Sequence, residues 1–243
     1  MIYWKPDPEK QKIREYVWRL MENKGVARFP GAFGRIPNFV GAEKAAHLAA
    51  GLDVFLNARV IKANPDSPQK KLREIALKSG KIVYMAVPKL RDERCFVELD
   101  PDVVGDRWKE ASTIKGAFRL GRQVYPWEMK KVDLVIAGSV AVNRMGQRIG
   151  KGGGFSDLEF AIARHFNLID DSTPVITTVH EVQILDREFP WKPYDIPVDY
   201  IITPIRAIKT DGKFKKPSGI FPDLLQKEMI KEIPILKRMG YGD

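Results

Sequence analysis

The residues best suited to chemistry lie between Arg148 and Asp157, which read Arg-Ile-Gly-Lys-Gly-Gly-Gly-Phe-Ser-Asp. Four of the five positions from Gly150 to Gly154 are glycine, so consecutive backbone N–H groups can turn toward one point. After Asp157 the apolar residues have helical spacing, so these N–H groups lie at the N-terminus of a helix, a place that can hold phosphate. Arg148 and Lys151 add positive charge, and Asp157 would complement the helix dipole or help to hold Mg²⁺.

The spacing of these glycines also excludes two common nucleotide-binding loops. It matches neither the dinucleotide GxGxxG pattern nor the Walker pattern that ends in GK[ST]. A Gly-rich turn that serves only helix packing is the alternative. The flanking arginine, lysine and aspartate favour phosphate binding over that alternative.

A second candidate is the pair Asp195 and Asp199, which precedes a strand-like run. Mg²⁺ prefers oxygen ligands and takes one or two protein carboxylates, so one of these aspartates could be a metal ligand. Carboxylates before a strand more often cap a turn, and without further information that interpretation is preferred.

Other reactive residues give little support for metal hydrolysis or nucleophilic catalysis. His47, His165 and His180 lack zinc-site spacing such as HExxH. His180 follows a strand-like run and either faces a cleft or is a structural residue, which is the commoner case. Ser139 lies in no GxSxG turn and Cys95 has no nearby histidine, so Cys95 is expected in the core or a strand.

The first element that must position these groups is a helix from Pro8 to Lys24, with Asp7 as N-cap and Gly25 just past its end. One face is apolar. The opposite face carries four polar residues, a pattern that is typical of a solvated face and only occasionally of one turned toward a ligand. These residues are Lys10, Gln11, Arg14 and Glu15.

The remaining elements alternate between strand-like and helical patterns, which predicts an α/β fold with a mainly parallel sheet covered on both faces. A strand over 53–61, a helix opened by Ser67-Pro68 and closed by Gly80, and a strand over 81–88 form the first such unit. Further strand-like runs are 95–99, 132–138, 174–180 and 198–204. We expect one domain over 1–204 and a basic C-terminal extension over 205–243, packed on it or trailing from it.

Charge and composition narrow the class of partner. The 41 Lys and Arg against 31 Asp and Glu give a net charge of +10, which attracts nucleotides, nucleic acid or phosphorylated metabolites, although it also suits a merely soluble or heat-adapted protein. A single cysteine excludes an intrachain disulfide and multi-cysteine metal sites. No apolar run is long enough to span a membrane, and the start MIYWKPDPEK is unlike a secretory leader, so we expect a cytoplasmic protein.

Residues 132–160, VDLVIAGSVAVNRMGQRIGKGGGFSDLEF, resemble the signature of the 5-formyltetrahydrofolate cyclo-ligase family. That signature is an apolar strand, a loop ending G-x-R-[LI]-G and a Gly-rich turn that leads to two tyrosines and an aspartate. Lys10 to Arg14 match the family's K-x-x-[LI]-R pattern, and Asp195 to Asp199 match D-x-x-V-D. Gln183 resembles a glutamine upstream of the latter. The likeness spans most of residues 9 to 204.

The resemblance implies a three-layer α/β/α fold and an ATP- and Mg²⁺-dependent ligase that converts 5-formyltetrahydrofolate, or a related N-formyl compound, into 5,10-methenyltetrahydrofolate, ADP and phosphate. By matching position, Arg148 and Lys151 would be the catalytic cations, and Asp157 and Asp195 would hold Mg²⁺. The nucleotide would be bound by a further set of residues from the first helix and the loop. This set is Lys10, Arg14, Gly150, Gly152, Gly153, Gly154, Phe155 and Ser156.

Two departures from the family pattern concern the acceptor, the compound that receives the phosphoryl group. Phe155-Ser156 replaces the two tyrosines, and the segment 64–69, Asn-Pro-Asp-Ser-Pro-Gln, lacks the family's Glu-x-x-Thr. They indicate a divergent branch with intact phosphate chemistry and an altered acceptor site. The competing hypothesis is a protein that keeps this fold but only binds nucleotides or RNA. RNA-recognition signatures such as paired aromatics on adjacent strands are not evident, which favours the enzyme.

Overall fold

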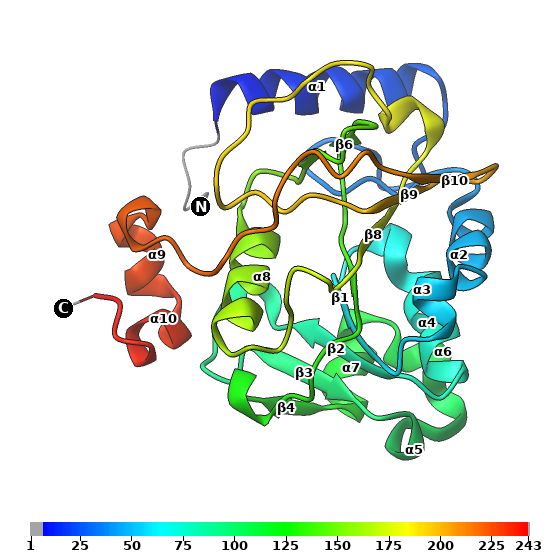
Figure 1. The fold of residues 1–243 in the computed structure, drawn as a ribbon. Coiled ribbons are helices and arrows are strands. Elements are labelled where there is room, and N and C mark those ends of the chain that lie inside the picture. Colours follow the sequence, from blue (N-terminus) through cyan, green and yellow to red (C-terminus); the bar gives the residue numbers. More distant parts are fainter. Residues whose placement is uncertain (1–6, 243) are drawn as a thin grey trace.

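The computed structural model describes residues 7–242, and its centre is an eight-stranded mixed sheet in the order β10-β9-β8-β5-β1-β2-β3-β4 (Figure 1). The strands are β1 Val60–Ala63, β2 Ile82–Ala86, β3 Phe96–Leu99, β4 Arg122–Val124, β5 Leu134–Ile136, β8 Val175–Thr178, β9 Tyr200–Ile202 and β10 Ala207–Lys209. Neighbours from β9 to β2 pair in parallel, and the outer strands β10, β3 and β4 pair antiparallel. A separate hairpin joins β6 Ala141–Val142 to β7 Arg148–Ile149.

Helices cover both faces of this sheet, as the alternation of strand and helix predicts. The larger helices are α1 Pro8–Asn23, α2 Ala42–Ala50, α4 Lys70–Lys78, α7 Ile114–Leu120 and α8 Phe155–His165. The shorter ones are α3 Asp53–Leu56, α5 Pro101–Val104, α6 Trp108–Ala111, α9 Lys227–Glu232 and α10 Pro234–Arg238. In Figure 1, α8 lies on one side of the sheet and α2, α4 and α6 lie on the other.

Two apolar cores result, because successive strand residues point to opposite faces. In β5, Leu134 and Ile136 join the core under α1, α2 and α4, whereas Val135 joins the core under α8, α9 and α10. Every residue of β1, β5 and β8 is buried. Burial of central strands on both faces is characteristic of a parallel sheet covered by helices.

The order of the strands creates a switch point between β1 and β5. From β1 the chain passes through α4 to β2 and onward to β4, and then returns to pair β5 with the other side of β1. In open α/β sheets, ligands bind outside the carboxyl ends of the strands at such a point. Asn64 follows β1 there, and Gly138 and Ser139 follow β5.

The expected strand over 53–61 is wrong in its first half. Residues 53–56 form the short helix α3, whose Phe55 packs in the core, and the strand begins only at Val60. The carboxylate of Asp133 fixes that start, because it accepts hydrogen bonds from the backbone N–H groups of Arg59 and Val60 at 2.8 and 2.9 Å. An apolar run of this length does not by itself distinguish a strand from a buried helical turn.

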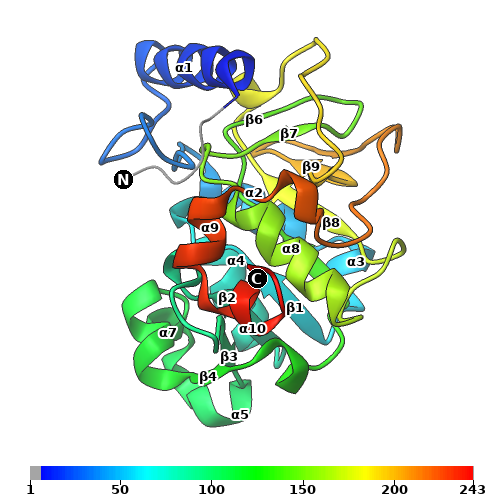
Figure 2. The same cartoon turned by 90° about the vertical axis from the view of Figure 1, so that its left-hand side faces the viewer.

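The segment after residue 204 packs on the sheet and on α8. β10 extends the sheet antiparallel to β9, and α9 and α10 lie beside α8 in both views (Figures 1 and 2). Within residues 7–242 no helix is long and apolar enough to cross a membrane. The expectation of a cytoplasmic protein rests in part on the N-terminal sequence MIYWKPDPEK. Residues 1–6 of that sequence lie outside the described part of the chain.

Candidate functional site

The Gly-rich loop runs from β7 into α8, as the sequence predicts. Gly152 and Gly154 have φ angles of +102° and +65°, a region that glycine enters without the steric cost other residues incur. Gly154 is the N-cap of α8 and provides no side-chain cap for the first turn of the helix. The N–H groups of that turn and the positive end of the helix dipole are therefore suited to an anion.

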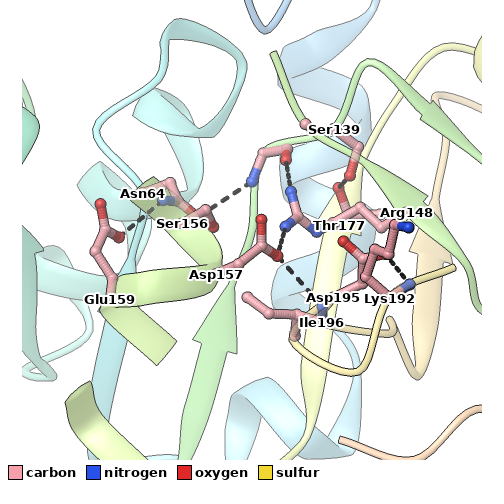
Figure 3. A network of polar contacts seen from close by, with 12 residues as sticks. Asn64, Ser139, Arg148, Ser156, Asp157, Glu159, Thr177, Lys192, Asp195 and Ile196 are labelled. Carbon is pink, nitrogen blue, oxygen red and sulfur yellow. Dashed lines mark hydrogen bonds and ion pairs between the residues drawn. The ribbon is translucent and has the colours of Figure 1, made fainter. Parts of the chain in front are cut away.

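Arg148 joins this loop to the carboxyl end of β5. Its side chain is 1% exposed, and it donates one hydrogen bond to the Gly138 carbonyl at 2.8 Å and another to Asp157 Oδ1 at 2.6 Å (Figure 3). Its Nε is buried and has no acceptor among residues 7–242. Arg148 thus holds the start of α8 against the switch point of the sheet and keeps one donor unused.

Helix α1 presents one cation to this loop and another to the neighbouring Asp195 segment. Lys10 forms an ion pair with Asp195, and Arg14 Nε donates to the Gly150 carbonyl at 2.7 Å. Arg14 also packs against Gly152, where an added Cβ would lie 3.3 Å from the guanidinium carbon. The prediction of a solvated polar face is therefore wrong at these two positions. Lys10 and Arg14 are 7% and 5% exposed, because the loop and the Asp195 segment cover them.

Asp157 and Asp195 belong to one network of polar contacts, in which both carboxylates accept hydrogen bonds from the segment 192–196 (Figure 3). Asp157 Oδ1 accepts from the Ile196 N–H at 3.2 Å, and Asp195 Oδ2 accepts from the Lys192 N–H at 2.7 Å. Burial and the nearby charge of Asp157 raise the pKa of Asp195 against the opposing effect of Lys10. Two carboxylates of one network supply the hard oxygen ligands that suit Mg²⁺, whose other ligands would come from water and phosphate.

Three other expected site residues differ in their surroundings. Lys151 is half exposed and approaches Asp66 at 3.3 Å. Ser156 donates a hydrogen bond to Asn64 at 3.1 Å, at the end of β1 (Figure 3). Phe155 packs against the core that contains α9, away from the ion pairs of α1. The structure therefore gathers Lys10, Arg14, Arg148, Asp157 and Asp195 into one cluster, and Phe155 belongs to a neighbouring surface.

The segment after β1 contributes residues that sequence reasoning missed. Asn64 Nδ2 donates to Glu159 Oε2 at 3.1 Å, and Glu159 forms a buried ion pair with Lys62. Asp66 provides a carboxylate in this segment: its Oδ2 would lie 2.8 Å from a Cβ added at Gly138. The sequence offered one signal for these residues: the segment directly follows a strand of the predicted parallel sheet, where ligands commonly bind.

Arg73 fixes the path of this segment from inside the protein. It is fully buried on α4 and donates hydrogen bonds to the backbone carbonyls of Asn64, Asp66 and Ser112. Burial lowers its pKa to about 10, so the guanidinium keeps its charge at neutral pH. The carbonyl oxygens of a loop at the site are thereby tied to the rigid helix beneath it.

Several other candidate residues have structural roles. Asp199 accepts a hydrogen bond from the Val175 N–H at the start of β8 at 2.7 Å and pairs with Lys216 at 2.9 Å, so it links separate segments and does not cap its own turn. His180 caps a short helical turn through Nδ1, and burial lowers its pKa. Ser139 bonds to Thr177 at 2.8 Å. Cys95 is a buried core residue, as expected, and burial raises the pKa of its thiol.

The protein is an α/β protein whose mainly parallel sheet is covered on both faces, with a Gly-rich loop at the switch point and buried cations around that loop. The family model for 5-formyltetrahydrofolate cyclo-ligases matches residues 6–204. The chain belongs to the 5-formyltetrahydrofolate cyclo-ligase family, which confirms the resemblance found in the sequence.

Comparison with individual relatives places the chain in a divergent branch. It is 40% identical over 234 residues to a methenyltetrahydrofolate synthase domain-containing protein of Danio rerio, an alignment that covers 95% of this chain and 61% of that protein. The chain thus spans about three fifths of that relative. A 5-formyltetrahydrofolate cyclo-ligase of Mycolicibacterium smegmatis is 27% identical over 106 residues, which are 42% of this chain and 51% of that one.

A solved structure supports the fold. The NMR structure of Aquifex aeolicus 5,10-methenyltetrahydrofolate synthetase superposes with a TM-score of 0.52 at 17% sequence identity, over 83% of this chain and 93% of that one. At this level of identity the similarity shows the α/β fold with its mainly parallel sheet.

Proposed function

We propose that this protein is an ATP- and Mg²⁺-dependent enzyme of the cyclo-ligase type that acts on 5-formyltetrahydrofolate or a related N-formyl compound. One observation carries the proposal: Lys10, Arg14 and Arg148 come from two separate parts of the chain and lie, largely buried, around a Gly-rich loop at a helix N-terminus and the Asp195 segment beside it. Such an arrangement is suited to the charge of a triphosphate.

The proposed reaction needs cations and positioning rather than a protein nucleophile. The formyl oxygen attacks the γ-phosphorus of ATP, and the bond between the β–γ bridging oxygen and that phosphorus breaks to release ADP. N10 of the folate then attacks the activated carbon. The phosphate leaves with the former formyl oxygen, N10 gives up its proton, and the methenyl ring closes. Phosphoryl transfer of this kind is catalysed mainly by orientation and electrostatic stabilisation.

Each part of the site has a place in this scheme. Lys10, Arg14, Arg148 and Lys151 would bind and orient the phosphates, and the first turn of α8 would donate backbone hydrogen bonds to them. Mg²⁺ held by Asp157 and Asp195 would neutralise phosphate charge. The existing ion pairs of Lys10 and Arg148 keep these cations at the loop before a nucleotide enters.

We expect MgATP to raise the melting temperature of the protein, because a ligand that binds only the folded state stabilises it by mass action. At a concentration of 100 times the Kd the gain is about 2.7 kcal/mol, or roughly 5 to 10 °C for a domain of this size. Differential scanning fluorimetry measures the shift, with NaCl of matched ionic strength as the control. No shift at millimolar MgATP would remove the basis of the proposal.

Lys151→Ala is expected to weaken MgATP binding about tenfold while leaving stability within about 0.5 kcal/mol, since the side chain is half exposed and its pairing with Asp66 is loose. The matched control is Lys131→Ala, which removes an exposed lysine that pairs with Asp170 at 2.9 Å outside the cluster. Isothermal titration calorimetry measures the MgATP affinity of both variants and of the wild type. Equal affinities in both variants would argue against a phosphate contact by Lys151.

We expect slow or absent turnover of 5-formyltetrahydrofolate despite clear nucleotide binding. Two hydrogen-bonding tyrosines of the family are replaced by Phe155 and Ser156, and each lost partner costs about 1 to 3 kcal/mol, or roughly 5- to 150-fold in binding. The assay follows the methenyl chromophore and ADP release together. Turnover at typical enzyme rates of about 1 to 1,000 per second would show that the acceptor site is intact. If the protein binds ATP but releases no ADP with any acceptor tested, the alternative of a protein that only binds nucleotides or RNA is favoured.

A further inference from the structure

A small recess lies where the C-terminal helix α9 meets the start of α8. Its lining comes from the turn after β2, from the first residue of α8 and from α9, and consists of Lys89, Arg91, Phe155, Met229, Glu232 and Ile233. It has room for about one water molecule. A pocket for a drug-sized ligand typically has about 300 to 1,000 Å³. The side chains of α9 therefore leave too little space beside Phe155 for a ring system of folate size.

Helix α9 is held firmly in this position. Met229 and Ile233 are 0% and 3% exposed and belong to the same core as Phe155, and in α10 Leu236 is fully buried. At the end of α10 the guanidinium of Arg238 lies over the Tyr125 and Trp127 rings, at 5.6 and 5.4 Å from their centroids. The wall that α9 forms is thus a fixed part of the fold.

The recess adjoins the phosphate loop at the carboxyl edge of the sheet. Phe155 directly follows Gly154, the N-cap of α8, and the turn with Lys89 and Arg91 follows β2, a parallel neighbour of β1. Lys89 and Leu90 have φ angles of +60° and +52°, which are uncommon for residues with side chains and concentrate at binding sites. Figure 2 shows α9 directly beside α8 at this edge.

Helix α9 lies outside the residues that the family model matches, which end at 204. The alignment with the Danio rerio relative covers 95% of this chain and so necessarily continues past residue 204. That alignment therefore extends into the C-terminal segment, and α9 is additional to the residues that the family model matches.

We propose that α9 forms a wall of the acceptor pocket, and that Met229 and Glu232 determine specificity by excluding acceptors as large and as anionic as a folate. This inference rests on the proposed function, because it takes the phosphate loop as the place of phosphoryl transfer. Met229 occupies space beside the Phe155 ring. Glu232 adds a negative charge next to Lys89 and Arg91, where a carboxylate of an incoming acceptor would otherwise be attracted. An acceptor that passes beside this wall would be a compact N-formyl compound with less negative charge than a folate.

The test compares Glu232→Ala and Met229→Ala with the wild-type protein and with Glu228→Ala, which removes an exposed glutamate of α9 that does not line the recess. Calorimetry measures binding of 5-formyltetrahydrofolate to the full chain with Mg²⁺ and a non-hydrolysable ATP analogue, and separately the affinity for the analogue. We expect Glu232→Ala to bind 5-formyltetrahydrofolate about tenfold more tightly than the wild type, and Glu228→Ala to match the wild type. Met229→Ala should also bind 5-formyltetrahydrofolate more tightly than the wild type. Since its truncation affects the core, Glu232→Ala decides the question if Met229→Ala does not fold.

The two proposals fail in different ways. Unchanged binding of 5-formyltetrahydrofolate by Glu232→Ala, with normal affinity for the ATP analogue, would overturn the role of α9 and leave the proposed function in place. Absence of analogue binding in the wild type would overturn the proposed function itself and, with it, this inference.

Discussion

Arg148→Met is expected to lower the affinity for MgATP by about 100-fold or more and to destabilise the protein by about 3 kcal/mol. The side chain is almost fully buried, and it joins the Gly138 carbonyl to Asp157. Without the guanidinium, the partly buried carboxylate of Asp157 loses its ion-pair partner, and the first turn of α8 loses its connection to β5. Titration calorimetry and urea denaturation give the two quantities.

Two further variants separate binding from stability. Arg164→Met removes an arginine of α8 that pairs with Asp171 at 2.7 Å outside the cluster, and it should leave nucleotide affinity unchanged. Arg148→Met combined with Asp157→Asn should recover part of the stability but none of the affinity, because the uncompensated charge is gone while the cation is still missing. A folded Arg148→Met with wild-type affinity would show that the loop binds phosphate without this residue.

Lys62→Met is expected to cost about 3 to 5 kcal/mol of stability at pH 8, because it leaves Glu159 as a buried charge without a cation. Burial raises the pKa of Glu159, and Lys62 opposes this effect, so the pKa rises further in the variant. A carboxyl whose pKa is higher in the folded than in the unfolded state stabilises the fold most below its unfolded pKa, here near 4.5, and this stability is lost as the pH rises. The deficit of Lys62→Met should therefore shrink as the pH falls from 8 toward 4.5.

Urea denaturation at several pH values measures this dependence, and a neutral double variant provides the control. Lys62→Met with Glu159→Gln should regain most of the lost stability at pH 8 and should show no shrinking deficit, because no buried carboxylate remains to titrate. A deficit in Lys62→Met that stays constant or grows toward low pH would contradict this account of the pair. Since Asn64 bonds both Glu159 and Ser156, loosening of the loop in the single variant would also weaken MgATP binding.

The local features of the site were predictable because they depend on neighbouring residues alone. Asp7 accepts hydrogen bonds from the Glu9 and Lys10 N–H groups and Pro8 begins the helix, as the capping pattern indicates. Gly152 and Gly154 adopt the positive φ angles for which the Gly-rich run is suited. The alternation of helices with apolar strands likewise predicts a parallel sheet, since short connections through helices favour that pairing.

The burial of the polar face of α1 was not predictable in the same way. Periodicity distinguishes the two faces of a helix, but it does not show whether a second layer covers the polar one. Here the segment around Asp195 and the Gly-rich loop cover Lys10 and Arg14. Similarly, the run over 53–61 has no local feature that separates a helical turn from a strand, and the contact with Asp133 on another part of the chain fixes the boundary.

By itself the sequence determined the alternation of helices and strands and that a loop rich in glycine and flanked by cations can hold phosphate. Only the tertiary structure decided which charges meet. Lys10 and Asp195 are 185 residues apart, and Lys62 and Glu159 are 97 apart. Their pairing depends on the order of the strands, in which β5 returns to lie beside β1, and on the packing of α1 and α8 at that edge. Strand order and helix placement follow from the burial of many apolar side chains at once, and no single segment of the chain carries that information.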